Sequence, residues 1–159
     1  MRIEEEIKLD YSDVLFRPKR STLKSRKDVD LNRKYTFKHS RLSWKGIPII
    51  ASNMDGVGEI DVAKKLSSHK LMTALTKQHD INQIGTIYNK NIFFDSIALS
   101  CGTSKDSYNR LNSILKKYPK FKFICIDVAN GYSENFSNFV FEVRKKYPKK
   151  TIIAGNVVT

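Results

Sequence analysis

A chain of 159 residues is long enough for one domain with a buried core, and a mean hydropathy of -0.42 with 28% charged residues predicts a soluble globular protein. No apolar run approaches the ~20 residues of a membrane span, and the start MRIEEE lacks the apolar stretch of a secretory signal, so the cytoplasm is the expected location. The net charge of +13 suggests a nucleic-acid partner, but the lysines are dispersed near predicted helix ends, where they stabilise the helix dipole, which argues against one.

Residues 1–47 are polar and basic and differ in character from the rest of the chain. Alternating apolar side chains in DVDL (28–31) and YTF (35–37) predict a small hairpin or a cover over one end of a sheet. We therefore expect an N-terminal cover segment over residues 1–47, followed by one domain over residues 48–159.

From residue 48 onward, short apolar runs alternate with stretches of helical spacing. The runs predict strands buried on both faces of a parallel sheet, over residues 48–53, 71–77, 95–101, 121–128 and 151–158. Apolar side chains between them recur at helical spacing over residues 60–66, 81–88, 108–118 and 136–147. Ser104 and Ser133 precede the last two stretches and are predicted N-caps. The repeat predicts an α/β fold with right-handed parallel crossovers.

Two of the predicted helices end in the same five residues, KKYPK, at 116–120 and at 145–149. Proline cannot continue a helix, so each helix is expected to end just before it and to lead directly into the next strand. The lysines at these exits are interpreted as part of a solvated basic surface.

Two architectures accept five parallel strands. A doubly wound domain fits 159 residues, whereas a complete (β/α)8 barrel typically needs ~250, so length alone favours the doubly wound domain. However, the turn after the first strand reads NMDGVG (53–58) instead of G-x-G-x-x-G, and the sequence contains no P-loop.

Polar residues close each predicted strand, and the carboxyl ends of parallel strands share one edge, where α/β proteins build their active sites. These residues are Asn53, Asp55, Lys77, His79, Ser100, Gly102, Thr103, Asp127, Asn130, Asn156 and Thr159. Lys77 and Asp127 are candidates for pairing across this edge. The alternative is that all of them are simply the first solvated residues after buried strands.

Other candidate sites are weaker. Cys101 and Cys125 lie in apolar runs, and the sequence sets no base beside Cys101, which favours buried, reduced thiols over a disulfide or a nucleophile. The turn SCGTS (100–104) would hold a phosphate on backbone N–H groups, although such turns are also ordinary N-caps. The histidines His39, His69 and His79 show no metal-ligand spacing and are expected on surface loops, so no metal site is predicted.

Six segments spread in order over the whole chain resemble the IMP dehydrogenase/GMP reductase family, and in particular its GMP reductase branch. They read DVLFRPKRS (13–21), LKSR (23–26), FKHS (37–40), PIIASNMD (48–55), CIDVANGYS (125–133) and AGNVVT (154–159). The resemblance implies a (β/α)8 barrel, of which this chain would be an N-terminal portion ending at strand five. It overrides the length argument, so the expected fold is a partial barrel of five strands and four helices after the basic cover segment.

The resemblance also implies an NADPH-dependent oxidoreductase that converts GMP to IMP and ammonia. In the family a cysteine attacks C2 of the purine, ammonia leaves, and hydride from NADPH reduces the covalent intermediate. Neither Cys101 nor Cys125 matches the motif of that cysteine. The nucleophile is therefore expected to be absent from this chain, which would be inactive alone.

What the resemblance carries over to this chain is the cofactor side of the site. Lys77 and Asp127 match family positions that contact NADPH and are the candidate catalytic residues. The candidate cofactor-binding residues are Ser25, Arg26, Lys77, Asp127, Val128, Ala129 and Asn156. Ser25 and Arg26 match positions that reach the cofactor of a neighbouring subunit, so a homo-oligomer, tetrameric in the family, is implied.

Three functional hypotheses stay open at this point. The first is GMP reductase, the second a self-contained doubly wound nucleotide-binding module, and the third a non-catalytic remnant that keeps interaction surfaces. Strand order distinguishes the second from the other two.

Overall fold

The computed structural model describes residues 5–88 and 94–158. The chain divides into two compact units, Met1–Asp30 and Leu31–Thr159. The domain boundary predicted at residue 47 stays a prediction. Residues 31–47 belong to the second unit.

The first unit contains two short 3-10 helices, η1 (Tyr11–Asp13) and η2 (Arg26–Asp28). Each begins with a capping box, in which Asp10 and Ser25 accept hydrogen bonds from the helix and an aspartate three residues later bonds back to the cap. Residues 28–31 therefore form no strand of the predicted hairpin: Asp28 ends η2, the residues after it are irregular, and the first hairpin strand begins at Arg33.

The second unit begins with an antiparallel hairpin of β1 (Arg33–Thr36) and β2 (Ser43–Gly46), in which Tyr35 lies opposite Trp44. The alternation around Tyr35 predicts the first of these strands, and the second strand was missed. Trp44 is only 5% exposed and packs among Met72, Ala74, Ala98, Phe123 and Cys125. The ring of Phe37, in the turn of the hairpin, also packs edge-on against Phe123, with centres 5.5 Å apart, so the hairpin is attached to the main sheet mainly through two aromatic side chains.

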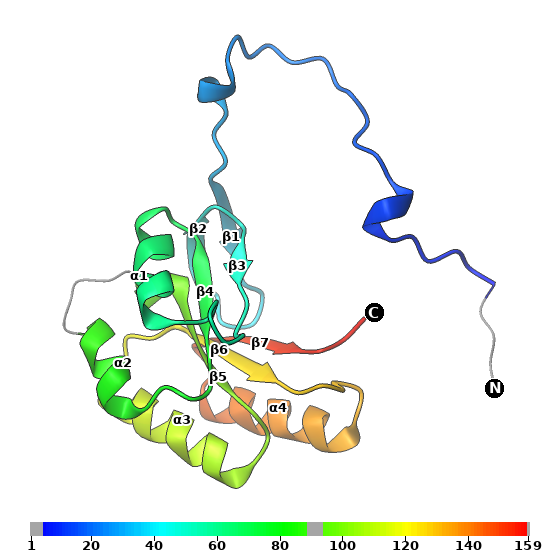
Figure 1. Ribbon diagram of the computed structural model, residues 1–159. Coiled ribbons are helices and arrows are strands. Elements are labelled where there is room, and N and C mark those ends of the chain that lie inside the picture. The colour runs from blue at the N-terminus through cyan, green and yellow to red at the C-terminus, as the bar shows by residue number, and fades with distance from the viewer. Residues whose placement is uncertain (1–4, 89–93, 159) are drawn as a thin grey trace. The chain divides into compact units, whose positions relative to one another are not determined.

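The main sheet has five parallel strands in the order β3-β4-β5-β6-β7, which confirms the predicted number and direction. The strands are β3 (Ile50–Ala51), β4 (Met72–Leu75), β5 (Ile97–Cys101), β6 (Phe123–Asp127) and β7 (Thr151–Gly155). The helices between them are α1 (Ile60–Ser68), α2 (Ile81–Tyr88), α3 (Lys105–Lys117) and α4 (Glu134–Lys146), with a 3-10 turn, η3 (Phe94–Ser96), before β5 (Figure 1).

The strands are shorter than predicted, and β3 is the extreme case, with two residues instead of six. Pro48 has no N–H to donate to a neighbouring strand, and the Ile49 N–H donates to the carbonyl of Ile47 at 2.7 Å, which turns the chain before the ladder begins. At the other end of the sheet, Val157 and Val158 are exposed after β7 has ended.

The helix ends follow the predicted signals. The Ser104 and Ser133 hydroxyls accept hydrogen bonds from the N–H groups of Ser107 and Phe136, both at 3.3 Å, so both predicted N-caps are confirmed. Helices α3 and α4 end at Lys117 and Lys146, two residues before each proline of the repeated KKYPK exits.

Two apolar layers lie on opposite faces of the main sheet. Ile97, Leu99 and Cys101 of β5 pack with all four helices in one cluster, whereas Ala98 belongs to the second cluster, with Trp44 of the hairpin. A doubly wound sheet would have helices on both faces and a reversal in strand order. Here the strands lie in the order in which they occur in the chain, and the helices cover one face of the sheet, as in a (β/α)8 barrel. The doubly wound domain that the chain length favoured is therefore wrong.

Candidate functional site

An open cavity of about 430 Å3 lies at the carboxyl ends of β3, β4 and β6. Its lining residues are Asn53, Met54, Asp55, Thr76, Lys77, Gln78 and Asp127. Four of the residues predicted from strand ends thus come together, although they lie up to 74 positions apart in the sequence. This grouping follows from parallel strands that deliver their next residues to one edge.

Lys77 also lines a second cavity of about 360 Å3, whose other lining residues are Gly102, Ser104, Asp106, Ser107 and Arg110. Its side chain is exposed, and Asp127 is half-buried. The ion pair predicted between Lys77 and Asp127 does not form within the described residues. The ammonium and the carboxylate therefore lie around one cavity without neutralising each other.

The segment that carries Lys77 is held on both sides. Before it, the Thr76 N–H donates to the Gly58 carbonyl at 2.9 Å. After it, Nε2 of His79 lies 3.3 Å from the same carbonyl and 3.3 Å from a carboxylate oxygen of Glu59. His79 is only 8% exposed, so its predicted place on a surface loop is wrong.

Arg110 of α3 completes this framework and was missed by the sequence analysis. Its guanidinium donates to the carbonyl of His79 at 2.6 Å and to the carbonyl of Ser100 at 3.2 Å. Burial lowers its pKa, and the neighbouring Cys101 thiol opposes that shift. Because both partners are backbone carbonyls, no pattern of side-chain types in the sequence predicts this contact.

The residues after β6 lie along the residues after β7. The Val128 N–H donates to Gly155 at 2.9 Å, the Asn156 N–H donates back to Val128 at 2.8 Å, and the Gly131 N–H donates to Asn156 at 2.9 Å. The structure thus brings Asn156 next to the predicted residue Val128, but Asn156 does not line the Lys77 cavity.

Gly131 should be essential for this arrangement. A Cβ atom at this position would lie 2.6 Å from the carbonyl oxygen of Asn156 and 2.9 Å from Cγ1 of Val157. We expect Gly131→Ala to displace Asn156 and to lower the free energy of unfolding by about 1–3 kcal/mol, as overpacking typically does. Urea denaturation measures this loss, and an unchanged midpoint would show that the loop relaxes freely. Gly102→Ala is the control, because its Cβ would meet nothing closer than 4.0 Å.

Ser25 and Arg26 belong to the first unit. The Ser25 hydroxyl caps η2 through the Lys27 N–H at 3.3 Å, and Arg26 is exposed. Their cofactor role stays a prediction. Thr159, the last of the predicted strand-end residues, lies outside the described residues.

Both cysteines are buried, as predicted for structural thiols. Burial, with a smaller contribution from Cys125, raises the pKa of Cys101 to about 12, and Arg110 only partly opposes this. Burial also raises the pKa of Cys125. Neither thiol has the depressed pKa of a nucleophile.

The turn over residues 100–104 is an ordinary N-cap. The Gly102 N–H donates to Oγ of Ser107 at 2.9 Å, and the Ser104 hydroxyl caps α3. The side chains of the turn and helix therefore occupy donors that a phosphate would need. In the described part of the chain there is no cluster of three or more metal-ligating side chains, and no helix is long and apolar enough to cross a membrane.

Comparison with known proteins identifies the family of the chain. Residues 8–159 match the family model described as IMP dehydrogenase / GMP reductase domain. The chain belongs to this family. It is 50% identical over 162 residues to the GMP reductase of Klebsiella pneumoniae and 48% identical over 160 residues to that of Caenorhabditis elegans. These alignments cover 100% and 99% of this chain but only 46% and 45% of the relatives, so the chain spans less than half of their length.

The structural comparison supports the fold of this IMP dehydrogenase/GMP reductase family member. The inosine 5' monophosphate dehydrogenase of Legionella pneumophila superposes with a TM-score of 0.74 at 24% identity, over 93% of this chain and 44% of that one. The predicted partial (β/α)8 barrel, with five strands and four helices, is therefore confirmed.

Proposed function

We propose that this chain forms the cofactor-binding part of a GMP reductase, a cytoplasmic oxidoreductase that uses NADPH to convert GMP to IMP and ammonia. The proposal rests on family membership and on one observation, namely that Lys77 and Asp127 line one cavity at the carboxyl edge of the strands. The two GMP reductases named above share about half of their residues with this chain over its length.

The chemistry of the lining residues fits a nicotinamide dinucleotide. Such a ligand has phosphate groups that need a cation, and ribose hydroxyls and an amide that donate hydrogen bonds. Lys77 supplies a cation with no ion pair among the described residues, and Asp127 supplies an acceptor from another strand. NADPH, when bound, would supply the hydride for the reduction.

In this proposal the residues of the chain bind and orient. Lys77 contacts the cofactor and stabilises negative charge that develops beside it, while Asp127 accepts hydrogen bonds from the cofactor's donors. Val128 and Ala129 bring the backbone after β6 to the same edge, and Asn156 is held beside them by its hydrogen bond to Val128. Ser25 and Arg26 contribute to the cofactor site of a neighbouring subunit in a homo-oligomer.

The covalent step needs a nucleophile that these residues do not provide. Attack on C2 of the purine requires a thiolate, and burial keeps both thiols of this chain protonated near neutral pH. We therefore propose that the attacking cysteine lies outside the 159 residues.

Titration of the purified protein with NADPH, followed by nucleotide fluorescence, tests the cofactor assignment. We expect saturable binding, and we expect Lys77→Ala to weaken it about tenfold, because a hydrogen bond from a charged group contributes roughly 1.5–3 kcal/mol. Lys64→Ala is the control, since that lysine is ion-paired with Asp61 on α1 at 2.6 Å and does not line the cavity. Equal affinities for wild type and Lys77→Ala would contradict the assignment and leave Lys77 as a solvated strand end.

A further inference from the structure

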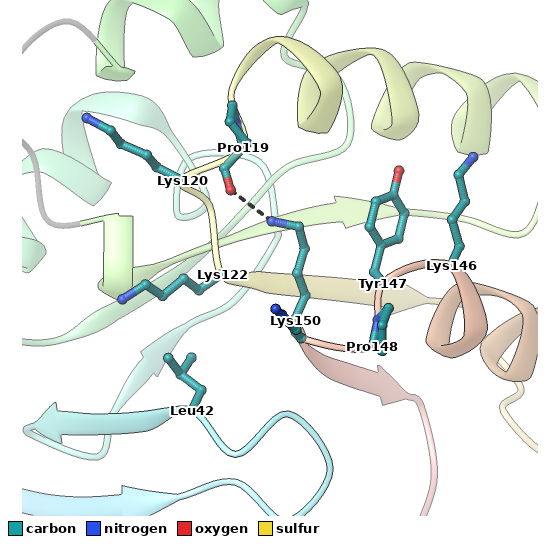
Figure 2. Close-up of a pocket in the computed structure, with 9 residues that line it drawn as sticks. Leu42, Pro119, Lys120, Lys122, Lys146, Tyr147, Pro148 and Lys150 are labelled. Atoms are coloured by element: carbon teal, nitrogen blue, oxygen red, sulfur yellow. Dashed lines mark hydrogen bonds between the residues drawn. The ribbon is translucent and has the colours of Figure 1, made fainter.

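The two KKYPK exits, which the proposed function does not use, meet at one cavity. Its volume is about 490 Å3, and it lies at the amino ends of β6 and β7, the opposite edge of the sheet from Lys77. Pro119 and Lys120 come from the first exit, and Tyr147 and Pro148 come from the second (Figure 2). Leu42, next to β2 of the hairpin, closes one side.

All of the charged side chains that line this cavity are positive. Five of the nine lining residues are lysines, and none is acidic; the lysines are Lys120, Lys122, Lys146, Lys149 and Lys150. Among the described residues, the one carboxylate that pairs with them is that of Asp95, which lies 2.7 Å from Nζ of Lys122. Lysine is a point-charge donor that suits phosphate oxygens approached from several directions. This cavity therefore attracts anions more strongly than isolated surface lysines do.

The backbone carbonyls at the helix ends would repel an anion, but cations of the chain already pair with them. The Arg144 guanidinium donates to the carbonyls of Tyr147, Pro148 and Lys150 at 3.3, 3.2 and 2.7 Å. Nζ of Lys150 donates to the carbonyls of Pro119, at 3.0 Å, and Phe121. Arg144 and Lys150 thus neutralise the floor. Of the other lysines, Lys122 pairs with Asp95, and Lys120 and Lys146 lie over aromatic rings on opposite sides of the cavity (Figure 2).

The lysine stems are also held in place. Nζ of Lys146 lies 5.1 Å from the ring centre of Tyr108, and Nζ of Lys120 lies 5.3 Å from that of Tyr88. Half-burial lowers the pKa of Lys150, a cost that an anion beside it would reduce.

We propose that this cavity binds a chain of two or three phosphate groups, carried by a nucleotide or by a short inorganic polyphosphate. The volume lies in the range of small-molecule sites, roughly 300–1,000 Å3. Pro119, Pro148 and Leu42 provide apolar walls for the rest of a nucleotide, while the lysines bind the phosphates. This site is independent of the proposed NADPH site.

Calorimetric titration of the purified protein with tripolyphosphate, ATP and adenosine tests the proposal. We expect saturable binding of tripolyphosphate and ATP that weakens with salt, and none of adenosine. Tighter binding of ATP than of tripolyphosphate would assign the site to a nucleotide, and equal affinities would assign it to the phosphate chain alone. Absence of binding by both phosphate compounds would overturn the proposal.

The double variant Lys146→Ala/Lys149→Ala locates the binding. It leaves the backbone contacts of Arg144 and Lys150 intact, and we expect it to weaken tripolyphosphate binding at least about tenfold. Lys64→Ala/Lys65→Ala on α1 removes the same charge elsewhere, and equal weakening by both variants would overturn the proposal in favour of diffuse attraction. Circular dichroism confirms that both variants are folded. Lys77→Ala should leave tripolyphosphate binding unchanged, which separates this site from the NADPH site.

Discussion

Residues 1–159 alone should oxidise no NADPH in response to GMP, even where they bind the cofactor. In the proposed function, reduction at C2 of the purine requires attack by a thiolate, and this chain has only Cys101 and Cys125. With a pKa of about 12, roughly one Cys101 thiol in ten thousand is ionised at pH 8. The loss of NADPH absorbance on addition of GMP measures the activity directly.

A thiol-labelling experiment provides the control for this prediction. Both cysteines should react with a soluble disulfide reagent much more slowly in the folded protein than in urea, because they are buried and protonated. GMP-dependent oxidation that disappears in Cys101→Ser would contradict the prediction. Oxidation that persists without both cysteines would point to a contaminating enzyme.

Trp44→Ala should cause the largest loss of stability of any substitution in the hairpin. The indole is 5% exposed and packs against the face of the sheet opposite the four helices, and truncation of a buried aromatic side chain typically costs about 3–5 kcal/mol. Domains of this size are stable by only about 5–15 kcal/mol, so the variant should be largely unfolded well below the wild-type urea midpoint.

Tyr35→Ala is the matched control for Trp44. Its ring stacks on Trp44 with centres 6.3 Å apart, but it is half-exposed, so its removal should cost about 1 kcal/mol. Equal, small losses for both variants would show that the hairpin contributes little to the stability of the sheet.

The parts of the fold that were predictable depend on local signals. The apolar runs, the serine caps and the prolines all act within a few residues, and they place five strands and four helices close to their observed positions. The second hairpin strand was missed because Trp44 and Gly46 are buried by contacts with distant strands. The order of the strands in the sheet also depends on long-range contacts, and the chain length alone favoured a doubly wound domain instead of the observed partial barrel.

The residues of the candidate site likewise include some that local signals predict and some that they do not. Asn53, Asp55, Lys77 and Asp127 were predictable because each follows a strand, and parallel strands end at one edge. Arg110 was not, because its partners are backbone carbonyls that come together only in the folded chain. His79 was predicted at a strand end, but its burial against the Gly58 carbonyl and the Glu59 carboxylate depends on the folded chain in the same way. The absence of the expected Lys77–Asp127 ion pair likewise depends on how far apart the two strand ends lie.

The contacts of His79 determine which form its ring takes. The two atoms that face Nε2, the Gly58 carbonyl oxygen and the Glu59 carboxylate oxygen, both accept hydrogen bonds. Nε2 must therefore carry a hydrogen, and in the neutral ring Nδ1 keeps its lone pair. Gly58 also accepts from Thr76, one residue before Lys77, so a shift of that segment changes the surroundings of the ring. The nitrogen chemical shifts of His79 should thus report ligand entry into a cavity that the ring does not line.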